Sequence, residues 1–138
     1  MKHFQLNELV DRTTFEKYGQ QCWQFFPKEA LEMLDGIREF FKSPVTVNNW
    51  HIGGQYQFRG WRPVWSNVGA PQSMHRKGGA FDCDIQGLTA EEARQNILAD
   101  KDNPLLKNIM RLEDGVSWLH TDTGIIPKGK NRIYLFRA

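Results

Sequence analysis

The sequence predicts an α+β domain in which helices pack on a small antiparallel sheet, as a single unit over residues 1–138. Three observations predict this fold: a helical repeat of apolar residues bounded by prolines, a short run of alternating residues, and several strand-like runs in the last third of the chain. Because these late strand-like runs follow one another, we expect neighbouring strands to be antiparallel.

The first expected element is a helix from Pro27 to Phe41. Its apolar residues recur at steps of three and four, at Ala30, Leu34, Ile37 and Phe41. Pro27 stands just ahead of this run and Pro44 just beyond it, so a proline marks each end of the helix.

A short β-branched strand is expected at Val45–Val47. It leads into a long irregular stretch, rich in glycine and aromatic residues, that runs to Pro71. Loops of this length inside a small domain are usually functional. We therefore expect this stretch to contribute to a site.

Residues Ala80–Ile85 alternate in the manner of a strand. One face carries Phe81, Cys83 and Ile85, and the other carries Ala80, Asp82 and Asp84. The two aspartates are therefore expected to point away from the core together. Thr89 and Glu92 then form a capping box, which opens a helix through Leu98.

The last third of the chain is expected to form a hairpin and a final strand. The strands Asn108–Leu112 and Val116–Thr121 flank Glu113, Asp114 and Gly115. Asp-Gly is a favoured turn sequence between antiparallel strands. Arg132–Phe136 predicts one further strand.

The composition is that of an ordinary globular domain, with 40% hydrophobic and 25% charged residues. The formal net charge is only +2 and the basic residues are scattered, which argues against nucleic-acid binding. No run approaches the ~20 apolar residues of a membrane span, and we expect neither a membrane anchor nor a signal peptide. Cys22 and Cys83 are expected to be buried thiols without a disulfide.

The residues that can carry chemistry lie in two short segments. The segment Ser73–Asp82 follows the pattern Ser-x-His-x-x-Gly-x-Ala-x-Asp and contains His75. The segment Trp118–Asp122 contains His120. A histidine near an aspartate is more often a surface or core pair than a metal site, so spacing alone leaves both interpretations open.

Together the two segments resemble the zinc-dependent D-alanyl-D-alanine carboxypeptidase-like family. Its relatives include D-Ala-D-Ala dipeptidases, phage L-alanyl-D-glutamate endopeptidases and, more distantly, the Hedgehog signalling domain. The resemblance implies a Hedgehog/DD-peptidase-like fold and one zinc ion (Zn²⁺) bound by His75, Asp82 and His120. Two imidazoles and a carboxylate suit zinc and leave a fourth position open for water, as in catalytic sites.

The resemblance extends to the segment Gly60–Pro63, in which Arg62 matches an arginine that contacts the substrate or the developing oxyanion. The donors of a guanidinium suit a carbonyl oxygen that gains negative charge, and a solvated loop arginine is the alternative. Ser73 is expected to hydrogen-bond within the substrate site or to cap the loop. Trp118 is expected to wall the substrate cleft, with a core position as the alternative.

The general base departs from the family pattern. Many relatives place a carboxylate three residues before the second histidine, and that position is Ser117 here. The candidates are Glu113, Asp114 and Asp122. Glu113 is favoured because the hairpin would set it opposite the strand that bears His120. Asp122 has the alternative role of orienting a metal-binding histidine.

These expectations predict a peptidase that cleaves a bond in the peptide stem of peptidoglycan, of the D-Ala-D-Ala carboxypeptidase or L-Ala-D-Glu endopeptidase type. A lone catalytic domain without an export signal suggests a monomeric phage or prophage cell-wall lytic protein, an endolysin or a virion protein. Such a protein is cytoplasmic before its release to the cell wall, or virion-associated. Because of Ser117, the alternative is an inactive zinc-binding module that recognises wall peptide or a protein partner.

Overall fold

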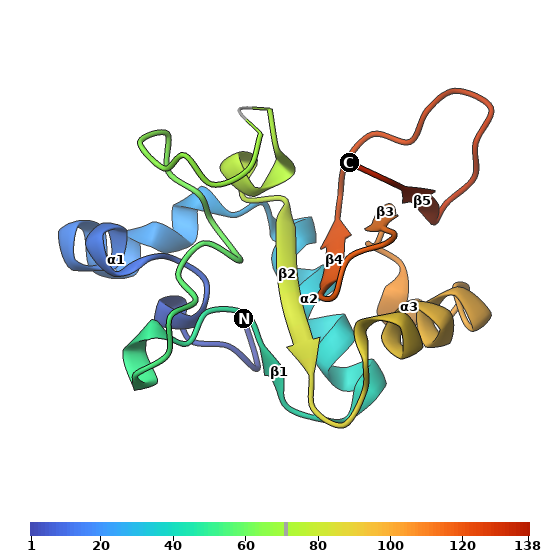
Figure 1. The fold of residues 1–138 in the computed structure, drawn as a ribbon, viewed down its shortest axis with the longest axis horizontal. Helices are drawn as coiled ribbons and strands as arrows, with labels where there is room; N and C mark the ends of the chain where they lie inside the picture. Colours follow the sequence, from blue (N-terminus) through green and yellow to red (C-terminus); the bar gives the residue numbers. More distant parts are fainter. Residues whose placement is uncertain (71) are drawn as a thin grey trace.

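The computed structural model describes residues 1–70 and 72–138, and within them the chain forms a five-stranded sheet and three α-helices (Figure 1). The strands pair in the order β1-β2-β4-β3-β5. The elements are α1 (Arg12–Tyr18), α2 (Lys28–Phe41), β1 (Val45–Thr46), β2 (Ala80–Ile85), α3 (Ala90–Ala99), β3 (Arg111–Glu113), β4 (Leu119–Asp122) and β5 (Tyr134–Phe136). The predicted α+β class is confirmed. Pro71, where the expected loop ends, lies outside the described residues.

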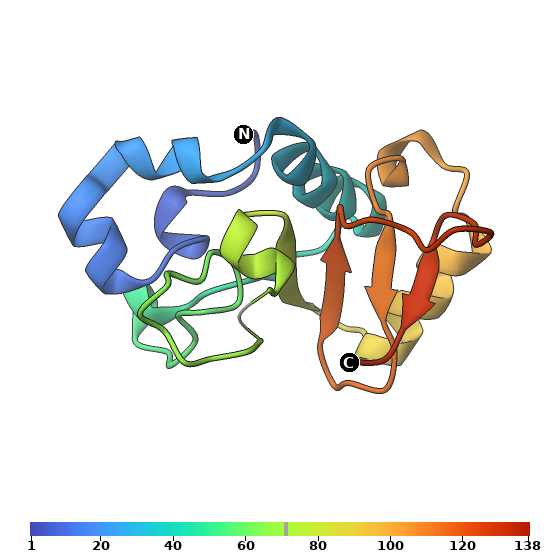
Figure 2. The same ribbon diagram turned by 90° about the horizontal axis from the view of Figure 1, so that it is seen from above.

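The sheet has one face in the core and one face that carries polar side chains. Strand β2 sends Phe81, Cys83 and Ile85 into the core, as its alternation predicted. Helices α2 and α3 lie against this face of the sheet (Figure 2). Asp82 and Asp84 point the other way, but only Asp84 is exposed. The long loop lies against β2 at this point, where Asp82 N–H donates to a loop carbonyl at 2.7 Å.

Helices α2 and α3 begin and end within a residue of their predicted bounds. Pro27 precedes α2, and Lys42 ends it in the left-handed conformation, with φ 54°. At the start of α3, the Thr89 hydroxyl accepts from the Glu92 N–H (3.1 Å), and the Thr89 N–H donates to the Glu92 carboxylate (2.9 Å). The predicted capping box is therefore confirmed. None of the helices in the described part of the chain has the length and apolar character needed to span a membrane.

Strands β3 and β4 form the predicted antiparallel hairpin, but its connection is longer than the predicted turn. Leu112 pairs with Thr121, so Glu113 lies within β3 and residues 114–118 connect the strands. The final strand β5 pairs parallel with β3, which corrects the fully antiparallel sheet that we expected. Residues 123–133 supply the long crossover that a parallel pairing requires.

The N-terminal segment contains α1, a helix that the sequence analysis did not predict. Asp11 caps α1 by accepting from the Thr14 N–H at 3.0 Å. Just before this cap, the Leu9 carbonyl accepts from the Trp61 N–H at 2.8 Å, which ties the N-terminal segment to the long loop. A Cβ atom at Gly60 would collide with the same Leu9 carbonyl, so glycine is required there. This contact fixes the part of the loop that lies beside the polar face of the sheet.

Candidate metal centre

The three predicted metal ligands come together on the polar face of the sheet. Asp82 in β2 and His120 in β4 are direct cross-strand partners. His75 lies in the 3-10 turn η4 (Met74–Lys77), and Gly78, at φ 70°, turns the chain from there into β2. One ligand atom from each residue lies within 4.8 Å of the others. His75, Asp82 and His120 are only 1%, 5% and 6% exposed, so a cation bound among them would be largely enclosed.

The ring of His75 is held in one tautomer. Its Nδ1 atom lies 2.9 Å from the Gly60 carbonyl oxygen, so Nδ1 carries the hydrogen and donates it. The Nε2 atom is therefore an acceptor, and among the described residues this buried atom has no hydrogen-bond partner. It lies 3.2 Å from Asp82 Oδ1. A buried nitrogen lone pair that faces a carboxylate is repelled by its negative charge. A cation bound between the two atoms would remove this repulsion.

The ring of His120 is held from its far side by Asp122. Its Nε2 atom lies 2.7 Å from Asp122 Oδ2, and its Nδ1 atom lies 2.8 Å from Asp82 Oδ1. Asp122 is fully buried and also accepts two bonds from Arg111, at 2.8 and 2.9 Å, and one from the Gly124 N–H at 2.8 Å. Because both its oxygens are occupied, Asp122 is arranged to orient His120.

Charges are strongly coupled within the cluster. Burial acts to lower the pKa of His120, but its hydrogen bonds to Asp122 and Asp82 raise that pKa to about 9. Burial acts to raise the pKa of Asp82, but the adjacent rings of His120 and His75 hold that pKa well below the ordinary carboxylate range. Burial lowers the pKa of His75, which keeps this ring neutral, as a metal ligand must be.

Arg62 reaches the cluster from the long loop and contacts a ligand directly. Its Nη2 atom donates to Asp82 Oδ2 at 3.0 Å, and its Nε atom donates to the Phe58 carbonyl at 2.7 Å. Asp82 thus offers Oδ1 to the two histidines and Oδ2 to Arg62. Arg62 was expected to contact the substrate or to be a solvated loop arginine, and its contact with a metal ligand is a further feature of the structure. Burial lowers the pKa of Arg62, and the negative charge of Asp82 opposes that shift.

A pocket of about 470 Å³ opens over the cluster. Glu113 lines this pocket, whereas Asp114 and Ser117 are not among its lining residues. Continuing the β3–β4 register by one residue sets Glu113 opposite His120, on the same face of the sheet. Asp114 instead pairs with Arg137 at 3.2 Å. Asp122 lines the pocket too, but both of its oxygens are occupied, so Glu113 is the candidate base with a pocket position and no such contacts.

Ser73 and Trp118 also line this pocket, and each lies two residues before a histidine ligand, His75 or His120. The Ser73 hydroxyl accepts from the His75 N–H at 3.2 Å, so it caps the turn that carries the first histidine. Trp118 is half-buried at the end of the β3–β4 connection. Among the described residues, its buried indole Nε1 has no hydrogen-bond partner.

Two residues of the site were not predicted from the sequence. Arg111 holds Asp122, and the two are cross-strand partners in β3 and β4. An opposite-charge pair of this kind could have been found from the hairpin register, had the length of the connection been known. Phe136 of β5 packs its ring against His120, with centroids 5.6 Å apart. No local pattern indicated Phe136, because it reaches the site through the parallel pairing of β5.

Two imidazole nitrogens and one carboxylate oxygen form a donor set that fits a divalent metal ion. The ligands lie on two paired strands and a capped turn, so the sheet positions them before any ion binds. Comparisons of the chain with protein-family models, with curated proteins and with solved structures found no match.

Proposed function

We propose that the protein is a zinc-dependent peptidase that hydrolyses a bond in the peptide stem of peptidoglycan. The observation that carries the proposal is the arrangement of His75 and His120. One ring nitrogen of each histidine faces Asp82, and the other is bound to a fixed acceptor. A surface or core ion pair does not need this convergence, whereas a metal site depends on it to orient its ligands.

Glu113 and Arg62 border the pocket beside the ligands, where they can act on a substrate. Zinc bound there supplies a Lewis acid that polarises the scissile carbonyl and makes a water molecule more acidic. Glu113 accepts the proton that the attacking water loses and returns it to the leaving amine. Arg62 stabilises the negative charge on the carbonyl oxygen while its Nη2 atom holds Asp82.

The substrate class rests on the resemblance of the segments Ser73–Asp82 and Trp118–Asp122 to the D-alanyl-D-alanine carboxypeptidase-like family. Both a D-Ala-D-Ala carboxypeptidase and an L-Ala-D-Glu endopeptidase are compatible with this resemblance. The proposed biological role is that of a phage or prophage lytic protein that acts on the bacterial cell wall.

Turnover of purified peptidoglycan tests the proposal. The protein, loaded with one equivalent of zinc, should release stem-peptide fragments whose masses identify the bond, and a chelator should abolish the release. The variant Asp84→Asn is a matched control, because Asp84 is an exposed aspartate on the same face of β2 as Asp82. It should keep full activity. Undiminished release in the presence of chelator would contradict a metal-dependent reaction.

The second candidate function is a zinc-binding module without catalytic activity. Ser117, in place of the carboxylate that many relatives carry, favours it. The same experiment separates the two functions, because a module of this kind would sediment with peptidoglycan in the presence of zinc and release no fragments.

A further inference from the structure

The geometry points to Arg94 of α3 as a positioning residue that fixes Glu113 and Trp118 at the rim of the metal pocket. Arg94 lies outside that pocket and touches none of the three metal ligands. It acts on the reaction only through the β3–β4 connection. The inference rests on the proposed function, because it assigns Arg94 a part in the turnover that Glu113 supports.

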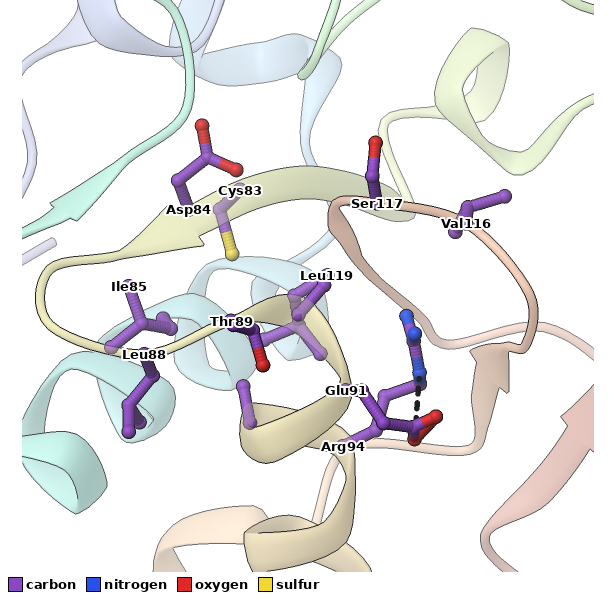
Figure 3. Close-up of a pocket in the computed structure, with 12 residues that line it drawn as sticks. Cys83, Asp84, Ile85, Leu88, Thr89, Glu91, Arg94, Val116, Ser117 and Leu119 are labelled. Atoms are coloured by element: carbon purple, nitrogen blue, oxygen red, sulfur yellow. Dashed lines mark ion pairs between the residues drawn. The ribbon is translucent and has the colours of Figure 1, made fainter.

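Arg94 joins the two ends of the β3–β4 connection. Its Nη1 atom donates to the Trp118 carbonyl at 3.1 Å and lies 3.5 Å from the Glu113 carbonyl. Glu113 is the last residue of β3, and Trp118 is the last residue of the connection. One guanidinium therefore closes the connection at its base, and it does so from the core side of the sheet. Figure 3 shows Arg94 extending from α3 toward the segment that carries Val116 and Ser117.

The burial of Arg94 is costly for the fold. Its side chain is only 4% exposed, and among the described residues its buried Nε atom has no hydrogen-bond partner. The nearest carboxylate, Glu91 Oε1, lies 3.5 Å from Nε and belongs to a side chain that is 57% exposed (Figure 3). A buried charge with such partial pairing stabilises a fold no better than an apolar side chain of similar size. A role of Arg94 in holding the β3–β4 connection would explain why a charged side chain is buried at this position.

The contact of Arg94 with the connection supports two side chains that line the metal pocket. Glu113 and Trp118 both line the metal pocket, one on each side of the connection. The connection has two further contacts, both at Asp114: its N–H donates to the Phe136 carbonyl at 2.7 Å, and its carboxylate pairs with Arg137 at 3.2 Å, so both hold the β3 end. Without Arg94 the Trp118 carbonyl would lose this hydrogen bond, and the Trp118 end would be held only through its neighbour Leu119, which pairs with Cys83. A displacement of about 1 Å at a catalytic group can cost ~10²-fold in rate.

Hydrogen exchange tests the contact without reference to activity. In the zinc-loaded protein, Arg94→Met should raise amide exchange about tenfold at Asp114, whose N–H is hydrogen-bonded at the start of the connection, and leave exchange in β2 and η4 unchanged. Arg94→Lys should fall between Arg94→Met and wild type, because it keeps a charged donor. Glu91→Gln is the matched control, since Glu91 contacts Arg94 but not the connection. Unchanged exchange in both Arg94 variants would overturn the inference.

A double-mutant cycle tests the link to Glu113. Arg94→Met should lower kcat about tenfold with little change in KM or zinc content, and it should have almost no further effect in the Glu113→Gln background. Equal losses in both backgrounds would show that Arg94 supports the fold in general and would overturn the inference. An inactive wild-type protein is a different result, because it would remove the proposed function and with it this role of Arg94.

Discussion

The Nε2 atom of His120 lies 2.7 Å from Oδ2 of Asp122, two residues further along the same strand. Arg111 in turn holds Asp122 in place. Rotation of the His120 ring would therefore break its buried contact with Asp122. The nitrogen that faces the metal site is thereby fixed as Nδ1. The affinity of the site for zinc should depend on this far-side contact as well as on the ligands themselves.

Asp122→Asn should weaken zinc binding by about 10- to 100-fold, because the amide carries no charge to support the His120 ring. Competition with a calibrated chelator measures the change. Asp114→Asn serves as the control and should bind zinc normally, because Asp114 pairs with the exposed Arg137 and does not line the pocket. Equal affinities for the two variants would remove the orienting role.

His75→Ala and His120→Ala should each reduce the zinc content from one ion per chain to nearly none. Two remaining ligands cannot enclose the ion, because each residue offers a single ligand atom. Elemental analysis after gel filtration measures the metal, and circular dichroism confirms that each variant is folded. Asp84→Ala is the control and should retain zinc. A folded histidine variant with wild-type zinc content would disprove this metal site.

Glu113→Gln should keep zinc and lose at least ~10²-fold in turnover, the usual contribution of a general base. The amide has nearly the same shape but cannot accept a proton, so binding of the substrate should change little. Steady-state kinetics on a stem peptide measures kcat and KM. Asp114→Asn again provides the control. Near-normal turnover by Glu113→Gln would move the base elsewhere in the pocket.

Arg62→Ala should lower turnover by roughly 10²-fold, since the donor to the developing oxyanion is lost. The contact between Arg62 and Asp82 adds a second effect, namely weaker zinc binding, because one ligand loses its support. Turnover should therefore be measured at saturating zinc, which separates the two effects. Arg62→Lys should recover little of the rate, because an ammonium lacks the planar fork. Normal kinetics in Arg62→Ala would place this residue outside the reaction.

The free energy of unfolding of the metal-free protein should be largest at about pH 6.5. The folded protein raises the pKa of His120 from 6.5 to about 9, so the stability this adds is complete below pH 6.5 and is lost as the pH rises through about 9. The pKa of His75 is lowered from 6.5, so stability is also lost as the pH falls below 6.5, where only the unfolded chain takes up that proton. Melting temperatures across this range measure the effect. Bound zinc should remove the decline in melting temperature above pH 6.5. A metal-free protein that melts at a higher temperature at pH 9 than at pH 7 would contradict the prediction.

Patterns within a few residues of one another predicted the elements that carry the site. Pro27 marks the start of α2, the alternation along β2 placed Asp82 on the polar face, and Thr89 with Glu92 started α3. Each of these features is decided by the conformational preferences of neighbouring residues, so one sequence is enough to find them. The ligand set followed from the resemblance of two short segments, and the structure brings those three residues together.

Features that depend on distant contacts could not be predicted. Asp-Gly favours a tight turn, yet burial of Leu112 and Leu119 on the core face sets the register, and the connection lengthens to suit it. The pairing of β5 with β3 depends on a crossover that no local pattern describes. The same holds for Arg94, whose partner carbonyl at Trp118 lies 24 residues further along the chain.

The direct pairing of Asp82 with His120 across β2 and β4 limits how this sequence can change in length. An insertion of one residue within either strand would turn one ligand into the core, because side chains alternate between the faces of a sheet. Residues 114–118, by contrast, lie outside both strands. Length variation among natural or engineered forms of this chain that keep the metal should therefore fall in the connection and spare the two strands.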